Sequence, residues 1–315
     1  MSPYNKCLSA GKLAIPLKLL TMKMTIRIGI NPLTWTNDDM PELGADTPLE
    51  VCLAEGAEAG YEGFELGNKF PRDPDVLGPI LDGFELALVS GWYSSALLER
   101  SAEEEIRALQ AHLNLLRSLD ANVMVFAETT DAVHGQMDTP VSQRPVMTEE
   151  QWALFTSRLT QVADYLRGEG VRMAYHHHMG TVVESENDID RMMEMTDESV
   201  GLLLDTGHLT YAGGDVLGTA RKHANRVVHV HCKDIRPEVL ARSIESNSSF
   251  LQSVLDGVFT VPGDGCIDYT AVWSVLESFN YSGWLVVEAE QDPAVATPLK
   301  YAKMGYSHLA DIVGS

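Results

Sequence analysis

Eight short apolar runs recur along this chain, and each is followed by a loop and a helical pattern. The runs cover residues 27–30, 63–66, 85–89, 123–126, 171–175, 200–204, 227–231 and 284–287. Strands separated by helices must pair in parallel, because a parallel connection needs about a dozen residues or more. Several runs are apolar throughout, as in strands covered on both faces. Eight such units predict a single closed (β/α)8 barrel of the TIM type.

The helical patterns between these runs carry recognisable start signals. We expect helices over residues 48–60, 73–81, 102–119, 149–167, 186–195, after Gly214, and over 269–279 and 294–312. Thr47 is the expected cap of the first helix, and Thr148 with Gln151 forms a capping-box pattern. An open doubly wound sheet would usually carry a glycine-rich phosphate loop after its first strand. Here that strand runs into Asn-Pro-Leu-Thr-Trp at residues 31–35, which favours the barrel.

The composition limits the classes of partner. The chain has 315 residues, of which 45% are hydrophobic, enough for one barrel of about 250 residues with extensions. Its 45 acidic and 23 basic side chains give a formal charge of −22. Such a chain repels phosphate backbones and anionic lipid surfaces, so we expect neither a nucleic-acid nor a membrane partner.

The cysteines and the N-terminus indicate a cytoplasmic enzyme with a separate leader. None of the four cysteines forms a C-x-x-C pair, and a chain of this length needs no disulfides, so we expect reduced thiols. No apolar run is long enough for a membrane span. Residues 1–24 contain four lysines and no acidic residue. We expect them to form a disordered leader or to follow from an upstream start codon, with the barrel over residues 25–315.

Function in such a barrel lies at the carboxyl ends of the strands. The fifth run is followed by His176, His177 and His178, and strand alternation places the first and third on one face. Asp205 directly follows the sixth run, where a carboxylate would be costly if unpaired. It could bind a metal or a cation, or it could cap the following turn.

The seventh and eighth runs end in the same way. His229, His231 and Lys233 share one face of the seventh strand, and His231 lies nearer its carboxyl end. Glu288 and Glu290 follow the eighth, and Glu290 could pair with a nearby lysine. Closure of the barrel should bring Asp205, His231, Glu288 and an imidazole from the fifth strand together. Such a mixed oxygen and nitrogen set suits Mn, Co, Zn or Fe better than Mg or Ca.

The earlier strands should complete the mouth of the barrel. We expect Trp35, Glu65, Trp92 and Glu128 to bind substrate, since each follows or ends one of the first four strands. Aromatic rings can lie against a sugar-like ring, and the carboxylates can bind hydroxyl groups. Core packing is the alternative interpretation of both tryptophans. The loop Gly263-Asp264-Gly265 could cover the site, although it is also ordinary turn chemistry.

Six segments resemble one enzyme family. They are GINPLTW at 29–35, YHHHMGT at 175–181, LDTGH at 204–208, HVHCKD at 229–234, FTVPGDG at 259–265 and GWLVVE at 283–288. Together they resemble the inosose dehydratases of bacterial myo-inositol catabolism, within the xylose-isomerase-like barrels. The resemblance runs from Ile26 to the C-terminus. The three-histidine run and the Pro-Leu-Thr-Trp opening are its most specific parts.

The resemblance implies a ligand set and cofactors. The broader group usually binds a metal through Glu, Asp, His and Glu from the last four strands, and Asp205, His231 and Glu288 match three of these positions. His176 stands where many relatives carry the first Glu, with Glu184 as the alternative ligand. The family implies Mn or Co. It also implies a glutathione requirement, although none of these residues indicates a glutathione site.

The resemblance also implies a reaction. A polyhydroxylated cyclic ketone, 2-keto-myo-inositol (scyllo-inosose), would lose water to give a trihydroxycyclohexane-1,2-dione. The metal would acidify the proton on the carbon next to the ketone, a base would remove it, and an acid would help the hydroxyl leave. We expect His178 and Lys233 near these steps, with His208 as the alternate; their order as acid and base stays open.

Two other functions remain open at this point. A ketose isomerase or epimerase would use the same metal chemistry but return the proton, and a sugar-binding barrel would not catalyse at all. The acidic composition argues against an apurinic endonuclease, because the chain lacks the basic surface that DNA requires. The sequence is compatible with a homo-oligomer and does not decide the oligomeric state.

Overall fold

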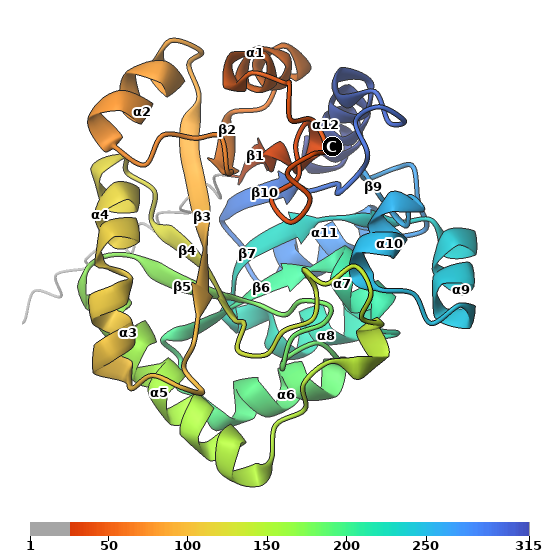
Figure 1. The fold of residues 1–315 in the computed structure, drawn as a ribbon. Helices are drawn as coiled ribbons and strands as arrows, with labels where there is room; N and C mark the ends of the chain where they lie inside the picture. Colours follow the sequence, from red (N-terminus) through yellow and green to blue (C-terminus); the bar gives the residue numbers. More distant parts are fainter. Residues whose placement is uncertain (1–25, 315) are drawn as a thin grey trace, which may run out of the picture.

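The computed structural model describes residues 26–314, which form a closed barrel of eight parallel strands surrounded by helices (Figure 1). The barrel strands are β1 (Ile26–Ile30), β2 (Gly63–Leu66), β3 (Ala87–Ser95), β4 (Val123–Glu128), β5 (Arg172–His176), β6 (Val200–Asp205), β7 (Val227–Cys232) and β10 (Gly283–Val287). Pairing of β1 with β10 closes the ring. The predicted barrel is therefore confirmed. The predicted leader, residues 1–24, lies outside the described residues.

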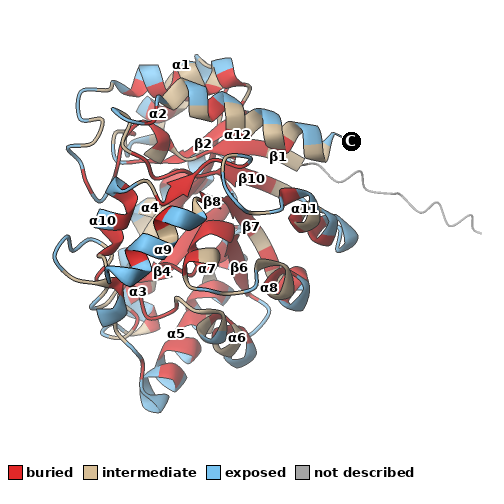
Figure 2. Cartoon of the chain, turned by 90° about the vertical axis from the view of Figure 1, so that its right-hand side faces the viewer, coloured by how far each residue is buried: buried red, intermediate tan, exposed pale blue. Residues whose placement is uncertain are grey.

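Helices cover the outside of the barrel and bury the faces turned toward it (Figure 2). They are α1 (Leu49–Ala59), α2 (Pro74–Asp82), α3 (Ala102–Ala108), α4 (Gln110–Ser118), α5 (Glu149–Gly168), α6 (Glu186–Met195), α7 (Thr206–Tyr211), α8 (Val216–His223), α11 (Tyr269–Ser278) and α12 (Pro298–Val313). Short 3₁₀ turns cover Pro32–Thr34, Val141–Gln143 and Ala224–Arg226. In the described part of the chain, no helix has both the length and the apolar character that crossing a membrane requires.

Local details differ from the expectations in three places. Thr47 does not cap α1: the helix follows Pro48, which supplies no side-chain cap. The helix expected over residues 102–119 is divided into α3 and α4 at Leu109. The connection between β7 and α11 contains four short elements, β8 (Asp234–Ile235), α9 (Pro237–Glu245), α10 (Phe250–Leu255) and β9 (Phe259–Thr260). The elements β8, α10 and β9 have at most six residues and give little sequence periodicity, whereas α9 is as long as α2 and amphipathic and was missed.

This insertion between β7 and α11 builds a second, smaller core beside the barrel mouth. The helices α9 and α10 lie next to each other at the right of Figure 1. Phe250 and Phe259 pack there with Met179 and Tyr211, which follow β5 and β6. The insertion is therefore fixed against the loops that carry the polar strand ends.

The strand register sets the height of those ends. Asp205 pairs directly with His231 across β6 and β7, and Val286 pairs with His231 across β10 and β7. The backbone N–H of Glu288 donates to the carbonyl of Cys232 at 3.3 Å, which extends the β10 contact by one residue. Side chains at the ends of three neighbouring strands therefore project into one layer.

The capping box predicted for α5 is confirmed and gives a test of helix stability. The Thr148 hydroxyl accepts from Gln151 N at 3.3 Å, and the Gln151 side chain accepts from Thr148 N at 2.9 Å. We expect Thr148→Ala to lower the free energy of unfolding by about 1 kcal/mol, because the first turn loses an acceptor. Urea denaturation measures the change, with Thr148→Ser as the control that keeps the hydroxyl. Equal stability of the Ala and Ser variants would contradict this account.

Candidate active site

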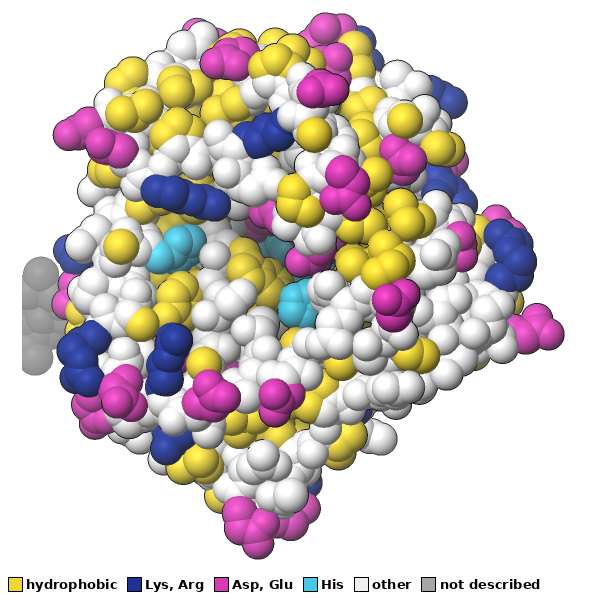
Figure 3. Space-filling view, in the orientation of Figure 1, with side chains coloured by type: hydrophobic (Ala, Val, Ile, Leu, Met, Phe, Trp, Pro, Cys, Tyr) yellow, Lys and Arg dark blue, Asp and Glu magenta, His cyan; other side chains and the backbone are white. Residues whose placement is uncertain are grey.

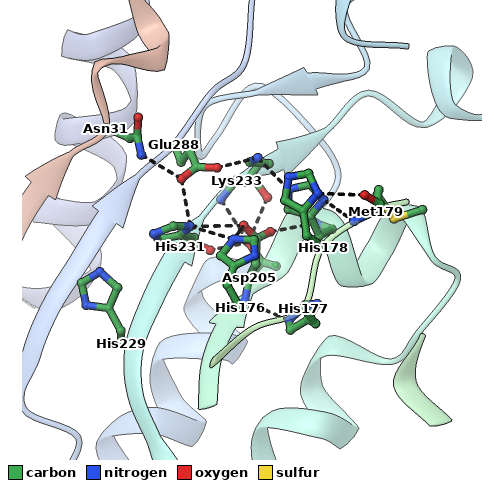
Figure 4. A network of polar contacts seen from close by, with 12 residues as sticks. Asn31, His176, His177, His178, Met179, Asp205, His229, His231, Lys233 and Glu288 are labelled. Carbon is green, nitrogen blue, oxygen red and sulfur yellow. Dashed lines mark hydrogen bonds and ion pairs between the residues drawn. The ribbon is translucent and has the colours of Figure 1, made fainter. Parts of the chain in front are cut away.

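Four buried side chains meet at the carboxyl ends of β5, β6, β7 and β10, and we call them the ligand cluster (Figure 4). His176 Nε2 lies 3.2 Å from His231 Nδ1 and 3.4 Å from Asp205 Oδ2. His231 Nδ1 lies 3.5 Å from Asp205 Oδ2 and 2.9 Å from Glu288 Oε2. These are the four residues expected from the sequence. The structure therefore brings one donor from each of the last four barrel strands to a common point.

The donor set fits a divalent cation. Metal bonds to imidazole nitrogen and carboxylate oxygen are about 2.0–2.2 Å long, so donors on one ion lie about 3–3.5 Å apart. The separations within the ligand cluster fall in that range. Asp205 Oδ1 accepts from His208 N at 2.7 Å and caps α7, but the buried Oδ2 receives no hydrogen bond. A cation would satisfy this oxygen, which is otherwise expensive to bury.

Position distinguishes the candidates that the sequence left open. His229 lies beside Glu65, with its Nε2 2.8 Å from Oε1, and meets the ligand cluster only through an edge-on ring contact with His231, with centroids 5.5 Å apart. Glu184 accepts from Gly180 N at 2.6 Å and lies 3.3 Å from Arg144 Nε, so its carboxylate is held elsewhere. The structure therefore places His231 and His176, rather than these alternatives, in the cluster.

Lys233 is fully buried behind the ligand cluster. Its Nζ lies 2.6 Å from Glu288 Oε1, 2.9 Å from Glu290 Oε2 and 3.0 Å from His208 Nε2, which uses all three of its N–H donors. Burial alone would lower the pKa of Lys233, but Glu288 and Glu290 raise it well above its ordinary range. Lys233 therefore stays charged and neutralises two buried carboxylates. Its expected part in proton transfer stays a prediction.

A cavity of about 250 Å³ opens directly onto the ligand cluster. Figure 3, in the view of Figure 1, shows histidine and acidic side chains inside a hollow near the middle of this face. The lining residues are Asn31, Leu33, Asp38, Asp39, Glu65, Leu66, Trp92, Ser94, Val125, His134, His176, His178, His231, Glu288 and Glu290. The cavity is thus small, and its walls are mainly polar or aromatic, with Leu33, Leu66 and Val125 as the aliphatic members.

The expected substrate-binding residues divide into two pairs. Trp92 and Glu65 line the cavity, and the Trp92 ring lies edge-on to the rings of His176 and His178, with centroids 5.2 and 5.6 Å away. Trp35 is buried against Phe64 and does not line it.

Trp35 and Glu128 have structural partners instead. The Trp35 indole N–H donates to Glu55 at 2.6 Å. The Glu128 carboxylate accepts from Ser95 Oγ at 2.8 Å and from Leu97 N at 2.6 Å, within a fully buried site. Neither side chain is therefore placed to contact substrate as expected. Both instead form hydrogen bonds within the protein interior.

The glycine loop at residues 263–265 also lies away from the cavity. Gly263 N donates to the Asp234 carboxylate at 3.2 Å, and Asp264 forms a 2.8 Å ion pair with Arg236. None of the three loop residues lines the cavity. The loop is held to β8 and Arg236 at the start of the insertion, which favours the turn interpretation over a cover for the site.

His178 lines the cavity in a fixed orientation. Its Nδ1 lies 2.8 Å from the Met179 carbonyl, so Nδ1 carries the proton and Nε2 is left as an acceptor. Burial lowers the pKa of His178 well below its ordinary range, which keeps the ring neutral. His208 lies behind it, with ring centroids 3.9 Å apart, and does not line the cavity. His208 also lies close enough to His176, Asp205 and Glu288 to help hold a metal ion, and its expected part as the alternate in proton transfer stays a prediction.

Some cavity residues were not singled out from the sequence. Asn31 directly follows β1, so the rule that strand ends carry function could have found it. Glu290 was interpreted as a residue that pairs with a lysine; its partner is the buried Lys233 and it faces the cavity. His134 comes from the long loop after β4, where no pattern marks it.

Comparisons with known proteins agree on the fold and on a narrower group. A family model described as a xylose isomerase-like TIM barrel matches residues 53–312. The rhizopine catabolism protein MocC of Rhizobium meliloti is 50% identical over 287 residues, covering 91% of this chain and 88% of that protein. An inosose dehydratase of Geobacillus thermodenitrificans is 45% identical over 291 residues, covering 92% of this chain and 98% of that protein.

Solved structures share the fold at low sequence identity. The IOLI protein with a bound zinc atom is 16% identical with a TM-score of 0.66, covering 91% of this chain and 98% of that one. An L-ribulose 3-epimerase is 17% identical with a TM-score of 0.65, covering 92% of this chain and 95% of that one. At this identity the two structures show a common barrel and nothing about the reaction.

The position of Glu184 predicts a pH-dependent stability. Burial raises its pKa to about 7, above the ordinary value of about 4.3. A raised pKa means that Glu184 contributes most to stability at low pH and loses this contribution as the pH rises through about 7. We therefore expect Glu184→Gln to gain stability relative to the original chain between about pH 5 and pH 8. Urea denaturation across this range measures the difference.

The same variant tests the ligand assignment. Glu184→Gln should bind a divalent metal as tightly as the original chain, because Glu184 lies outside the ligand cluster. A stability difference that does not change with pH would contradict the burial argument. Loss of metal binding would instead place Glu184 among the ligands.

Proposed function

The chain belongs to the xylose isomerase-like TIM barrel family, and from this premise we propose that it is a metal-dependent inosose dehydratase. The reaction converts 2-keto-myo-inositol into a trihydroxycyclohexane-1,2-dione and water. The observation that carries the proposal is the 45% identity to an inosose dehydratase over 92% of this chain. The ligand cluster and the cavity above it supply a site for that chemistry.

The ligand cluster would hold the metal through His176, Asp205, His231 and Glu288. A bound divalent cation would polarise the ketone oxygen and make the proton on the neighbouring carbon easier to remove. Two nitrogen and two oxygen donors suit a borderline transition metal, and we propose Mn or Co. Lys233 keeps Glu288 in place by an ion pair of 2.6 Å on the oxygen Oε1, while Oε2 faces His231.

We assign His178 as the base. Its Nδ1–H is held by the Met179 carbonyl, so the free Nε2 is the only acceptor nitrogen of the ring. Its ring lies beside that of His176, with centroids 5.4 Å apart, so a substrate bound at the cluster would reach it. Phe250 covers the other side, with ring centroids 4.9 Å apart, and shields this imidazole from water.

Glu290 is placed to hydrogen-bond to the departing hydroxyl group. Glu65, Glu288 and Glu290 are the buried acids that line the cavity in the described chain. Glu288 belongs to the ligand cluster and Glu65 is held by other donors, which leaves Glu290 facing the substrate. The Lys233 ammonium orients it at 2.9 Å.

The cavity fits a small ring with several hydroxyl groups. Its volume of about 250 Å³ admits one six-membered ring and little more. Trp92 offers an aromatic surface on one wall, and carboxylates on the others can accept from hydroxyl groups. We therefore propose a polyhydroxylated cyclic ketone as substrate.

A second candidate function is a step in rhizopine catabolism. The relative with that name is 50% identical to this chain, above the 45% of the inosose dehydratase. A ketose isomerase or epimerase is a weaker alternative, because its support is a shared fold at 17% identity. A non-catalytic sugar-binding barrel would not require His178 and Glu290 to be oriented beside a donor cluster.

Three further expectations stay predictions. Glutathione as a cofactor follows from the family resemblance alone. A cytoplasmic location is supported by the unpaired thiols of Cys52, Cys232 and Cys266, which a reducing compartment would preserve. A homo-oligomer is the third prediction, and a measurement of the molecular mass in solution would test it.

The dehydratase proposal predicts a defined product. The chain incubated with scyllo-inosose and Mn²⁺ should give a dione that absorbs in the ultraviolet. Asp205→Asn should abolish the signal, because a cluster donor is lost. His178→Gln should lower kcat by about 10²–10⁴-fold while the metal content stays unchanged, as expected for loss of a general base. Exchange of substrate protons with solvent without formation of the dione would favour an epimerase.

The two tryptophans should respond differently in the same assay. Trp92→Ala should raise KM by about two- to tenfold, the equivalent of about 0.5–1.5 kcal/mol of aromatic contact. Trp35→Phe removes the indole hydrogen bond to Glu55 and should lower the free energy of unfolding with KM unchanged. Paired measurements of KM and urea stability test both. A rise in KM for Trp35→Phe would return that residue to the substrate site.

A further inference from the structure

Glu65 is a buried carboxylate that joins four strands below the ligand cluster. It lies on β2 and is 3% exposed. Its Oε1 lies 2.5 Å from Ser90 Oγ and 2.8 Å from His229 Nε2, and its Oε2 accepts from Asn31 Nδ2 at 2.8 Å. His231 Nε2 lies between the two oxygens, 3.2 Å from Oε1 and 3.1 Å from Oε2. Four donors around two oxygens leave no room for a carboxyl proton.

This arrangement decides which nitrogen of His231 carries the proton. An ionised carboxylate is an acceptor only, so His231 must donate its Nε2–H to Glu65. With Nε2–H held by Glu65, Nδ1 is the atom that faces Asp205, Glu288 and His176, and a metal ion bound there would take the place of any proton on Nδ1. Glu65 therefore turns the lone pair of His231 toward the ligand cluster.

Asn31 links Glu65 to Glu288 through hydrogen bonds from its side-chain amide. Its Oδ1 accepts from Leu33 N at 3.0 Å, which fixes the orientation of the amide. The Nδ2 group is left to donate to Glu65 Oε2 at 2.8 Å and to Glu288 Oε2 at 3.1 Å. The two hydrogens of one amide thus hold two carboxylates at a set separation.

We propose that Glu65 is a positioning residue of the metal centre, which sets the tautomer of His231 directly and the place of Glu288 through Asn31. The inference rests on the metal site of the proposed function and replaces the expected contact of Glu65 with substrate. A metal-bound histidine usually donates its other N–H to such a partner, and loss of that partner weakens metal binding by about 10- to 100-fold.

A second metal ion at Glu65 is the competing interpretation. Glu65, His229 and His231 lie close enough to bind an ion by themselves. Both ions would then share His231, one on each nitrogen, which requires removal of the last ring proton. The hydrogen-bond distances around Glu65 need no such step. The chain should therefore bind one ion.

The test is Mn²⁺ binding by the full chain after removal of metal with a chelator. Electron paramagnetic resonance of free Mn²⁺ gives affinity and stoichiometry without any substrate. Glu65→Gln places an amide N–H₂ against N–H donors and should weaken binding about 10- to 100-fold. Asn31→Ala should weaken it less, because His231 keeps its carboxylate partner.

Glu128→Gln is the matched control. Glu128 is likewise a buried carboxylate at a barrel strand end, and it accepts from Ser95, Leu97 and Thr130. Its partners all lie outside the ligand cluster, so its variant should lose stability but keep its Mn²⁺ affinity. The visible spectrum of bound Co²⁺ should change for Glu65→Gln and stay unchanged for Glu128→Gln.

Each outcome separates the inference from the proposed function. If the original chain binds no Mn²⁺, both the proposed metal centre and this inference are overturned. Tight binding by both the original chain and Glu65→Gln would overturn the inference alone, as would an equal loss in Glu128→Gln. Two ions per original chain would establish the competing site. If Glu65→Gln does not fold, unchanged affinity in Asn31→Ala would overturn the coupling to Glu288.

Discussion

The mouth of this barrel is organised around buried negative charge. Glu65, Asp205, Glu288 and Glu290 are each at most 4% exposed, and an unpaired ion in such surroundings costs several kcal/mol. Lys233 offsets part of this charge, since its ammonium contacts both Glu288 and Glu290. Burial raises the pKa of Glu290 to about 7, and one lysine still does not balance Glu65, Asp205 and Glu288. The remaining charge makes the ligand cluster a strong site for a divalent cation, and it fixes how the surrounding side chains are oriented.

The fold brings these buried carboxylates together at one end of the barrel. The parallel register sets the ends of β6, β7 and β10 at one height, and barrel closure turns their side chains to a common centre. The insertion after β7 then packs Phe250 against His178, so the imidazole proposed as base lies between an apolar wall and the cluster. A cation and a neutral base held side by side can separate a proton from carbon. Glu290, which follows β10, is the carboxylate proposed to contact the departing hydroxyl group.

The sequence predicted the parts that depend on periodicity. Alternation along each strand placed His176, His178 and His231 on the inner face, and the rule that strand ends converge brought Asp205 and Glu288 to them. How deeply each side chain at a strand end is buried could not be predicted in the same way. Lys233 follows a strand as an active-site lysine would, but only the packing of β8, α7 and the insertion shows that its ammonium is enclosed. Trp35 and Trp92 both follow strands, and a 3₁₀ turn at Pro32–Thr34 directs the first into the core. The six-residue helix α10 is too short to show a pattern, whereas α9 is amphipathic and could have been found.

The central claim is that one divalent cation binds where the last four barrel strands end. Anomalous diffraction from a crystal of the chain grown with Mn²⁺ tests it most directly. We predict a single peak at about 2.0–2.2 Å from His176 Nε2, His231 Nδ1 and the carboxylate oxygens of Asp205 and Glu288. A peak between Glu65 and His229, or no peak at this end of the barrel, would contradict the account.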